Sequence, residues 1–283
     1  MLAFSPMTLV RAPDVRVRPA RAGEWPKAAP DAALLATDPD GVLVALAPDG
    51  RLVGRAAAAV REDALLLARL EVEPGERGRG VGRALLEAVR AYGAGRRARA
   101  LEALAGGGPE GVAFLLRAGL SLRTLVLTFS GAPPESGAGA PPLETVGLGA
   151  PLSGWVADLD RETRGFARAP DWERAVARGE VLALRRRGRP EAVGALRRAG
   201  ATAWIGPASA RSPGGAALLL VALAARAGAS GAARVLVRVP AEAAALLEAA
   251  GRLGLAAEDA APFLALRRRG DFRRLAGSPG PFL

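Results

Sequence analysis

The chain has 283 residues and a formal net charge of +11, and it contains neither cysteine nor histidine. At roughly 100–200 residues per domain, this length predicts two domains. Without cysteine and histidine, disulfides, thiol chemistry, imidazole bases and the common zinc ligand sets are excluded. We therefore expect no metal site.

The positive charge is spread along the chain and comes almost entirely from arginine. Nucleic-acid binding needs clustered cations and usually aromatic stacking platforms, and only 4% of the residues are aromatic. We therefore expect no nucleic-acid partner. No uncharged apolar run reaches the roughly 20 residues of a membrane-spanning helix, and the first residues lack the pattern of a secretory signal. These features predict a soluble, cytoplasmic protein.

The first half of the sequence predicts alternating strands and helices. A Pro-Asp-Gly turn at residues 47–50 separates two apolar, alternating segments, which is typical of a hairpin. Apolar residues at helical spacing after residue 80 predict an amphipathic helix. In chain order we expect strands at 15–18, 41–46, 51–60 and 64–72, a helix at 80–92, a strand at 97–104, a helix at 109–118 and a strand at 122–129.

The second half partly repeats this order after a segment rich in glycine and proline. We expect helices at 152–162 and 171–178, strands at 181–186, 192–198 and 202–205, a helix at 213–227, a strand at 234–239, a helix at 241–253 and a strand at 263–268. The fold class is therefore α/β (α+β), with mixed, mostly antiparallel sheets flanked by helices. The expected domains are 1–131 and 143–270, with a linker at 132–142 and a tail at 271–283.

Residues 70–85 form the most informative segment, because a strand runs through a glycine-rich turn into a helix. This arrangement directs several backbone N–H groups and the positive end of the helix towards one point, where an anion such as a pyrophosphate can bind. The turn carries three glycines and three arginines: Gly78, Gly80, Gly82, Arg77, Arg79 and Arg83. An ordinary strand-to-helix turn with solvated arginines is the alternative. The sequences of a P-loop and of a dinucleotide-binding turn are both absent.

The segment resembles the signature of the GNAT superfamily of N-acyltransferases, Arg/Gln-x-x-Gly-x-Gly/Ala after a Val-x-Pro strand end. The matching residues are Val72, Pro74, Arg77, Gly80 and Gly82. A later segment, 114–120, is similar to the Phe-Tyr-x-x-x-Gly-Phe motif of the same superfamily. The second half is similar to the degenerate C-terminal domain of a bacterial tandem-GNAT family, through residues 160–168 and 205–216.

The resemblance implies two GNAT-type domains, of which the first binds acetyl-CoA and the second binds no coenzyme. It implies transfer of an acyl group from acetyl-CoA to the amine of a small molecule by direct attack. A backbone N–H of residues 70–72 would polarise the thioester carbonyl. The implied coenzyme contacts come from Leu70, Glu71, Val72, Arg77, Gly78, Arg79, Gly80, Val81, Gly82, Arg83 and Phe114.

The acid and base of the reaction are less clearly marked. Leu115 stands where the superfamily usually has the tyrosine acid, and the only tyrosine, Tyr92, lies on another predicted helix. Glu71 is the candidate base, although alternation along the strand places it on the face opposite Leu70 and Val72. A solvated carboxylate is the alternative. The sequence is thus consistent with an active N-acetyltransferase or with a non-catalytic acyl-CoA-binding or regulatory module.

In the second half, Asp160, Glu162 and Arg168 are candidates for lining a substrate cleft between the domains. The alternative is an amphipathic helix that exposes a polar face to solvent.

Overall fold

The computed structural model describes residues 15–21, 23–26, 31–106, 108–134, 140–146 and 154–277. Their contacts group into two compact units. The first unit comprises the described parts of Met1–Val60 and Leu67–Arg99, and the second those of Arg61–Leu66 and Ala100–Leu283. Helices flank mixed sheets whose pairing is mostly antiparallel, so the predicted fold class is confirmed.

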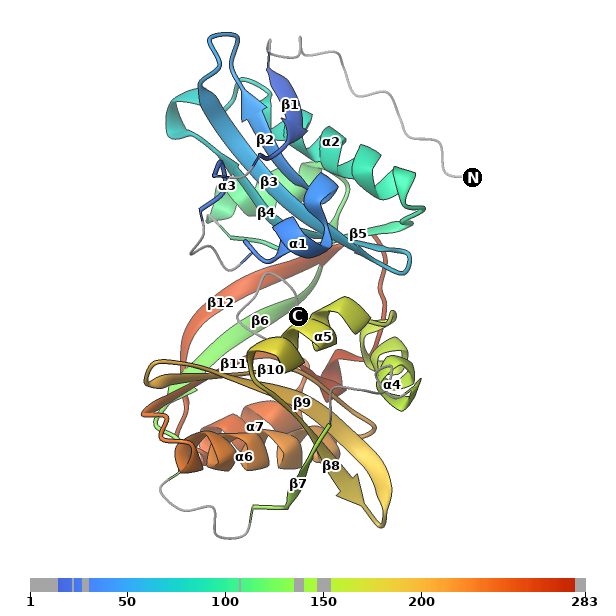
Figure 1. Cartoon of the computed structure of the whole chain (residues 1–283), viewed down its shortest axis with the longest axis vertical. Coiled ribbons are helices and arrows are strands. Elements are labelled where there is room, and N and C mark those ends of the chain that lie inside the picture. Colours follow the sequence, from blue (N-terminus) through green and yellow to red (C-terminus); the bar gives the residue numbers. More distant parts are fainter. Residues whose placement is uncertain are drawn as a thin grey trace. The chain divides into compact units, whose positions relative to one another are not determined.

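The first unit contains a four-strand segment of sheet in the order β1-β2-β3-β4. Its elements are β1 (Arg16–Pro19), α1 (Leu34–Thr37), the 3-10 turn η1 (Pro39–Gly41), β2 (Val42–Leu46), β3 (Leu52–Arg61), β4 (Ala64–Val72), the 3-10 turn η2 (Pro74–Glu76) and α2 (Val81–Gly95). Strands β3 and β4 extend into the second unit at their shared hairpin tip. Helix α2 packs along β1 and β2 (Figure 1).

The contact between α2 and the sheet explains the spacing of apolar residues in the helix. Val81, Leu85 and Val89 are buried at helical intervals. Gly54 of β3 lies directly beneath them, because a Cβ added there would be 2.9 Å from Leu85 Cδ1. The helix predicted at 80–92 is therefore confirmed, and the absence of a side chain at Gly54 allows its close approach.

The second unit has the strand order β5-β12-β6-β11-β10-β9-β8-β7, with β13 beside β10. Its strands are β5 (Ala100–Leu104), β6 (Ser121–Gly131), β7 (Leu143–Thr145), β8 (Glu180–Arg186), β9 (Arg189–Ala199), β10 (Thr202–Ala210), β11 (Arg234–Pro240), β12 (Ala256–Ala265) and β13 (Leu275–Ala276). Its helices are α3 (Pro109–Arg117), α4 (Gly154–Arg164), α5 (Ala169–Arg178), α6 (Pro213–Ala229), α7 (Ala244–Arg252) and the 3-10 turn η3 (Phe272–Arg274).

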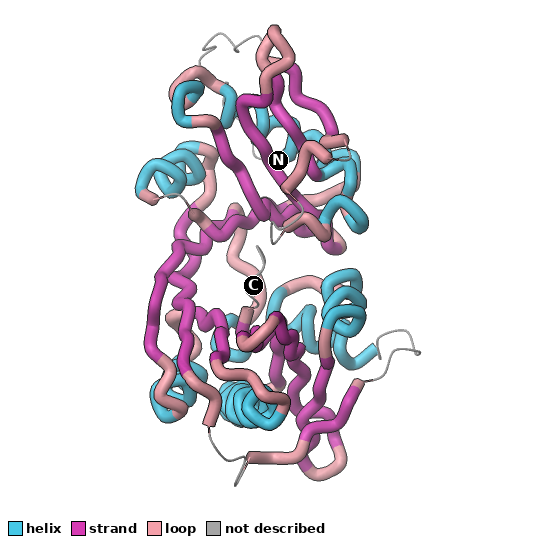
Figure 2. The backbone as a smooth tube through the Cα atoms, turned by 60° about the vertical axis from the view of Figure 1, so that its left-hand side comes forward, coloured by secondary structure: helices cyan, strands magenta, loops and turns pink. Residues whose placement is uncertain are grey.

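Helices cover both faces of the sheet around β9 (Figures 1 and 2). Ala192 and Leu196 belong to the apolar cluster that includes α6 and α7. Val193 and Ala195, on the opposite face, pack with residues of α4 and α5. This alternation with a period of two residues is what a strand buried on both faces requires.

The last long strand of the chain is inserted between two strands of the first half of the sequence. In β12, Phe263 pairs with Leu104 of β5 on one side and with Thr124 of β6 on the other. The strand runs over Ala256–Ala265 rather than the predicted 263–268. Its first five residues are exposed and two of them, Glu258 and Asp259, are charged, so they lack the apolar alternation that marks a strand in sequence.

The segment predicted as a C-terminal tail is partly structured. Phe272 and Leu275 are buried at 1% and 0% exposure, and Ser209 of β10 pairs with Leu275. Residues 271–277 are therefore not a tail, because they complete the sheet and its core, while residues 278–283 lie outside the described residues. Of the predicted linker, residues 135–139 also lie outside the described part. The domain boundaries predicted from the sequence stay a prediction.

Candidate functional site

The glycine-rich turn between β4 and α2 has the backbone conformation that its sequence predicts. Gly78 and Gly80 adopt positive φ angles of 75° and 89°, and Gly80 is the N-cap of α2. A residue with a Cβ in this left-handed region costs about 1–2 kcal/mol, so glycine is strongly favoured at both positions. Helix α2 then begins at Val81, whose side chain is 1% exposed and anchors the first turn to the sheet.

The N-terminus of α2 is open to an anion. No side chain caps it, and its first turn contains no acidic residue. The first backbone N–H groups of a helix have no partner within the helix and carry its positive dipole end. Gly78 is exposed and Gly80 is half-buried, so ligand atoms can approach the backbone of the turn. These features fit a phosphate group.

The three arginines of the turn differ in their contacts. The Nε of Arg77 donates to the carbonyl oxygen of Val72 at 3.3 Å, and Arg79 forms a 3.3 Å ion pair with Glu76. Arg83 is half-buried and forms no ion pair within the described part of the chain. Arg83 therefore keeps its full hydrogen-bonding capacity for a bound anion.

Glu76 is a negative charge beside this turn that the sequence analysis did not assign. It is bound by Arg51 at 2.7 Å, and this hydrogen bond is the main reason why the pKa of the Glu76 carboxyl is lowered. Arg51 lies 25 residues before Glu76, so no local sequence signal links them. Glu76 stays ionised and offsets part of the positive charge of the turn.

The end of β4 shows the predicted alternation. Leu70 and Val72 are half-buried, whereas Glu71 is exposed. The Glu71 carboxylate is paired with Arg69, whose Nε donates to the buried Asp31 at 2.7 Å. Glu71 therefore belongs to a surface ion-pair chain, and its role as a base stays a prediction.

Leu115, at the usual position of the tyrosine acid, and Tyr92, the only tyrosine, are both engaged in contacts within the protein. Leu115 on α3 is 6% exposed and packs in the core, and its neighbour Phe114 is half-buried. The hydroxyl of Tyr92 donates to the carboxylate of Asp38 at 2.9 Å, and Asp38 is 2% exposed. Asp38 also accepts the backbone N–H of Val60 at 3.2 Å. Tyr92 thus contributes to a buried polar contact of the first unit.

Two of the three charged residues assigned at the start of the second half, Asp160 and Arg168, do not face solvent. Asp160 and Arg168 are 0% and 2% exposed and form a 2.7 Å ion pair. Asp160 also accepts hydrogen bonds from Trp172 Nε1 at 2.7 Å and Ser209 Oγ at 3.1 Å. For Asp160 and Arg168, both interpretations from the sequence, a cleft lining and a solvated face, are wrong, because the two side chains are buried. A charge pair of this kind is kept inside because all its polar groups are satisfied. Glu162, by contrast, is exposed.

The second unit contains a comparable strand–turn–helix element, β10–α6, whose helix start is closed. Ser212 is the N-cap of α6 and accepts the backbone N–H of Gly215 at 3.0 Å. The Ser212 hydroxyl donates a hydrogen bond of 2.5 Å to Glu191 Oε1. The same carboxylate lies against Gly215, because a Cβ added to Gly215 would be only 2.4 Å from Glu191 Oε1. A carboxylate of the chain itself therefore occupies this helix terminus. The Ser-Pro pair at residues 212–213 is a recognisable cap signal, but Glu191 is not adjacent in sequence.

The parallel strands β10 and β11 separate beyond Ile205, and the C-terminal segment fills the gap. They pair only from Thr202 to Ile205, after which Ala208 pairs with Ala276 of β13. Arg238 of β11 pairs with Gly277, with a backbone hydrogen bond of 2.8 Å from Gly277 N to Arg238 O. Residues 275–277 thus pair with the facing edges of β10 and β11, so these edges are not open to a ligand.

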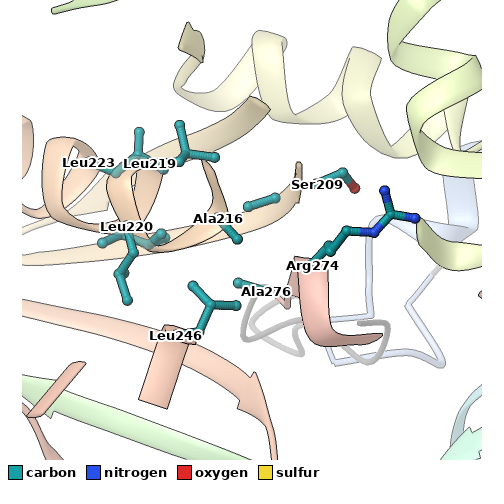
Figure 3. Close-up of a pocket in the computed structure, with 10 residues that line it drawn as sticks. Ser209, Ala216, Leu219, Leu220, Leu223, Leu246, Arg274 and Ala276 are labelled. Carbon is teal, nitrogen blue, oxygen red and sulfur yellow. The ribbon is translucent and has the colours of Figure 1, made fainter. Parts of the chain in front are cut away.

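The pocket next to this gap is small (Figure 3). Its cavity volume is about 10 Å³, which approximates the space for one water molecule. Ser209 and Arg274 lie at one end and leucines at the other. The lining consists of Ile205, Ala208, Ser209, Ala216, Leu219, Leu220, Leu223, Leu246, Arg274 and Ala276. A space of this size does not admit an acyl chain.

No helix in the described ranges has the length and apolar character needed to cross a membrane. Within the same ranges, no three histidine, cysteine, aspartate or glutamate side chains are placed to hold a metal ion.

Comparison with known proteins gives a consistent fold. No curated protein sequence matches the chain. Among solved structures, a putative acetyltransferase from Pyrococcus horikoshii is similar with a TM-score of 0.70 at 15% identity, covering 99% of this chain and 98% of that one. A GCN5-related N-acetyltransferase from Sphaerobacter thermophilus has a TM-score of 0.58 at 16% identity, covering 93% and 99%.

A tandem GNAT protein from the clavulanic acid biosynthesis pathway is also similar, with a TM-score of 0.61 at 18% identity over 89% of this chain and 98% of that one. At these identities the likeness concerns the fold. The sequence match is more specific, because residues 13–115 match the family model described as Acetyltransferase (GNAT) family, and this range contains the whole glycine-rich turn. Residues 13–115 thus match the GNAT acetyltransferase family model, and the chain as a whole has a fold similar to those of solved GNAT-related proteins.

Proposed function

We propose that the protein is an acetyl-CoA-dependent N-acetyltransferase that acts on the amine of a small molecule. The observation that supports this most directly is the open N-terminus of α2. The left-handed Gly80, an uncapped first helical turn and the arginines Arg77 and Arg83 lie together within this one short segment, as a pyrophosphate site would require.

In this proposal the backbone at the end of β4 holds the acyl group. The N–H groups at Leu70–Val72 would donate to the thioester carbonyl and stabilise the negative charge that develops when the amine attacks. Phe114 would contribute a further coenzyme contact. Acetyl-CoA supplies the acyl group and the thiolate leaving group, and no metal takes part.

The proton transfers determine the expected rate. A general acid typically contributes about 10²–10⁴-fold to a rate. Leu115 has no proton to give and is buried, and Tyr92 is already bound to Asp38. We therefore expect water to protonate the thiolate and turnover to be slow for this superfamily. Glu71 is the proposed base, provided that its pairing with Arg69 opens during the reaction.

The same observations support a second candidate, a non-catalytic acyl-CoA-binding or regulatory module. It shares the open turn of α2 but does not require an acid or base, and the buried Leu115 favours it.

One experiment separates the two candidates. The purified protein is titrated with CoA while its Tm is measured, and thiol release from acetyl-CoA is followed with a panel of amines, aminoglycosides, polyamines and amino acids. A CoA-dependent rise in Tm with amine-dependent thiol release supports the enzyme. A rise in Tm with no release for any amine supports the binding module. An unchanged Tm would exclude both.

A further inference from the structure

The hairpin that joins β3 to β4 ends in three consecutive charged residues: Arg61, Glu62 and Asp63. Arg61 forms a forked contact with Asp171 at the start of α5, with Nε–Oδ2 and Nη2–Oδ1 distances of 3.1 and 3.0 Å. The two side chains are only 3% and 9% exposed. Two parallel hydrogen bonds between a buried guanidinium and a carboxylate fix orientation as well as distance.

The next two residues of the tip have partners from other segments. Glu62 accepts hydrogen bonds from Arg161 of α4, at 2.9 and 2.8 Å, and from the backbone N–H of Ala167 at 3.1 Å. Asp63 accepts two hydrogen bonds of 2.6 Å from Arg269, and this contact is the main reason why the pKa of Arg269 is raised. All three tip residues are therefore held by opposite charges. We call these partners, Arg161, Ala167, Asp171 and Arg269, the platform.

The platform is itself tightly connected. The backbone N–H of Asp271 donates to the carbonyl oxygen of Thr163 at 2.8 Å, and a Cβ on Gly270 would lie 2.2 Å from that oxygen. The segment containing Arg269 thus touches the end of α4, backbone against backbone. Phe166, which is 0% exposed, packs against Leu66 of β4. The parts of the platform on α4 and on the C-terminal segment are therefore in direct contact.

Strand β4 continues without interruption from this tip to Val72. Its residues Leu65, Leu66 and Leu67 are at most 4% exposed, so both faces of the strand are buried. A shift of such a strand by one residue would move every side chain to the opposite face of the sheet. A tip that is held in place therefore sets where each residue of β4 lies along the strand direction. At about 3.3 Å per residue, Leu70 lies roughly 23 Å along the strand from Asp63.

We propose that Arg61, Glu62 and Asp63 are positioning residues for acyl transfer. Held by the platform, they set the position of β4 and hence of the backbone at Leu70–Val72 that receives the thioester. This inference rests on the proposed function. It gives the second half of the chain a task in the reaction although its own strand–turn–helix element is closed.

The test reverses the charge of Glu62 in its exposed ion pair with Arg161. The control makes the same change in an ion pair of similar exposure elsewhere in the chain. Glu62 and Arg161 are 38% and 51% exposed with a 2.8 Å contact, and Glu180 and Arg226 are 35% and 49% exposed with a 2.9 Å contact. Either pair contributes only about 0–1 kcal/mol to stability, so E62R and E180R should lower Tm similarly. The left-handed backbone of Glu62 (φ 51°) tolerates arginine, since Arg187 adopts φ 52° in this chain.

We expect E62R to lower kcat about 10-fold or more, because misplacement by about 1 Å can cost about 10²-fold. CoA affinity should stay within about twofold of the wild type, since the turn of α2 is unaltered. The double variant E62R/R161E should recover part of this loss, because it returns an opposite charge to position 62 but not the acceptor for the Ala167 N–H. E180R should leave kcat unchanged. Equal kcat values for E62R and E180R would overturn the proposal.

Hydrogen exchange provides a readout that does not depend on activity. Amides of residues 67–72 should exchange faster in E62R than in wild type and E180R, and the double variant should restore part of their protection. Unchanged exchange in E62R would overturn the proposal even if the enzyme is active. If no amine is acylated by the wild type, the proposed function fails, and the exchange measurement still decides whether the platform holds β4.

Discussion

The two strand–turn–helix elements of this chain, β4–α2 and β10–α6, differ in whether the chain itself supplies a partner for the backbone N–H groups at the start of the helix. In the first, Gly80 caps α2 without a side chain, and no carboxylate lies in the first turn. In the second, Ser212 caps α6 and Glu191 lies against Gly215. The same backbone plan is thus open to an external anion in one unit and is filled by the chain's own carboxylate in the other.

The strands beside the two helices extend this contrast. The second element has no open strand edge at this point, because β13 pairs with β10 beyond Ile205, where the pairing of β10 with β11 ends. A helix N-terminus can bind an external anion only when the chain leaves its N–H groups without a partner of its own, and of these two helices only α2 meets that condition. Four changes test whether this difference decides where the coenzyme binds.

The largest effect is expected from Gly80→Val. A β-branched residue at φ 89° is strained, so the substitution should distort the turn that we propose to bind the phosphate. We expect CoA affinity to fall at least about 100-fold and the CoA-dependent rise in Tm to vanish, as measured by thermal unfolding. Gly214→Val is the control, because Gly214 lies in the first turn of α6, has no positive φ, and a Cβ there meets nothing within 4 Å. An unchanged CoA response in Gly80→Val would contradict the assignment of the turn.

A smaller loss is expected from Arg83→Ala. A charge-assisted hydrogen bond contributes about 1.5–3 kcal/mol, part of which is lost to solvent competition here, so affinity should fall roughly 10-fold. Calorimetric titration with CoA measures it. Arg211→Ala changes the arginine that precedes α6, and it should leave CoA affinity as it is. Equal losses in both variants would show that the effect comes from net charge alone.

Glu76→Gln should strengthen CoA binding about two- to fivefold, because it removes a negative charge beside the turn and frees Arg79. The pKa of Glu76 is lowered, so the group is ionised at neutral pH, and the wild-type bridge is lost only as pH falls below the usual carboxyl range. The affinity ratio between variant and wild type should therefore stay constant between about pH 6 and pH 8. A ratio that changes in this window would point to another titrating group.

The smallest effect is expected from Glu191→Gln in the second unit. Removing this carboxylate charge from the start of α6 should lower stability by about 0.3–1 kcal/mol, seen as a small decrease in Tm. Calorimetry should still give one CoA per chain, because β13 continues to fill the gap beside β10. A second equivalent of CoA, in the variant or in the wild type, would show that the second unit is not closed.

Much of the secondary structure follows from local patterns. The strand at β4, the helix α2 and the hairpin β8–β9 lie within a few residues of their predicted ranges, because alternation and helical spacing of apolar residues are properties of short segments. The glycine-rich turn is similarly local, since Gly78 and Gly80 adopt the left-handed conformations for which glycine is suited. The range of β12 was wrong because its exposed, charged first half has no apolar alternation.

Most of the long strands and helices, and the glycine-rich turn of the proposed coenzyme site, could thus be predicted from local sequence, whereas the short elements α1, β7 and β13 could not. The burial of Asp160 with Arg168, the closure of α6 by Glu191 and the completion of the sheet by residues 271–277 became visible only in the folded chain. Each of these outcomes depends on contacts between residues that are far apart in sequence or on different elements. A charged side chain is stable inside a protein only beside a particular partner, and the fold alone brings that partner within reach.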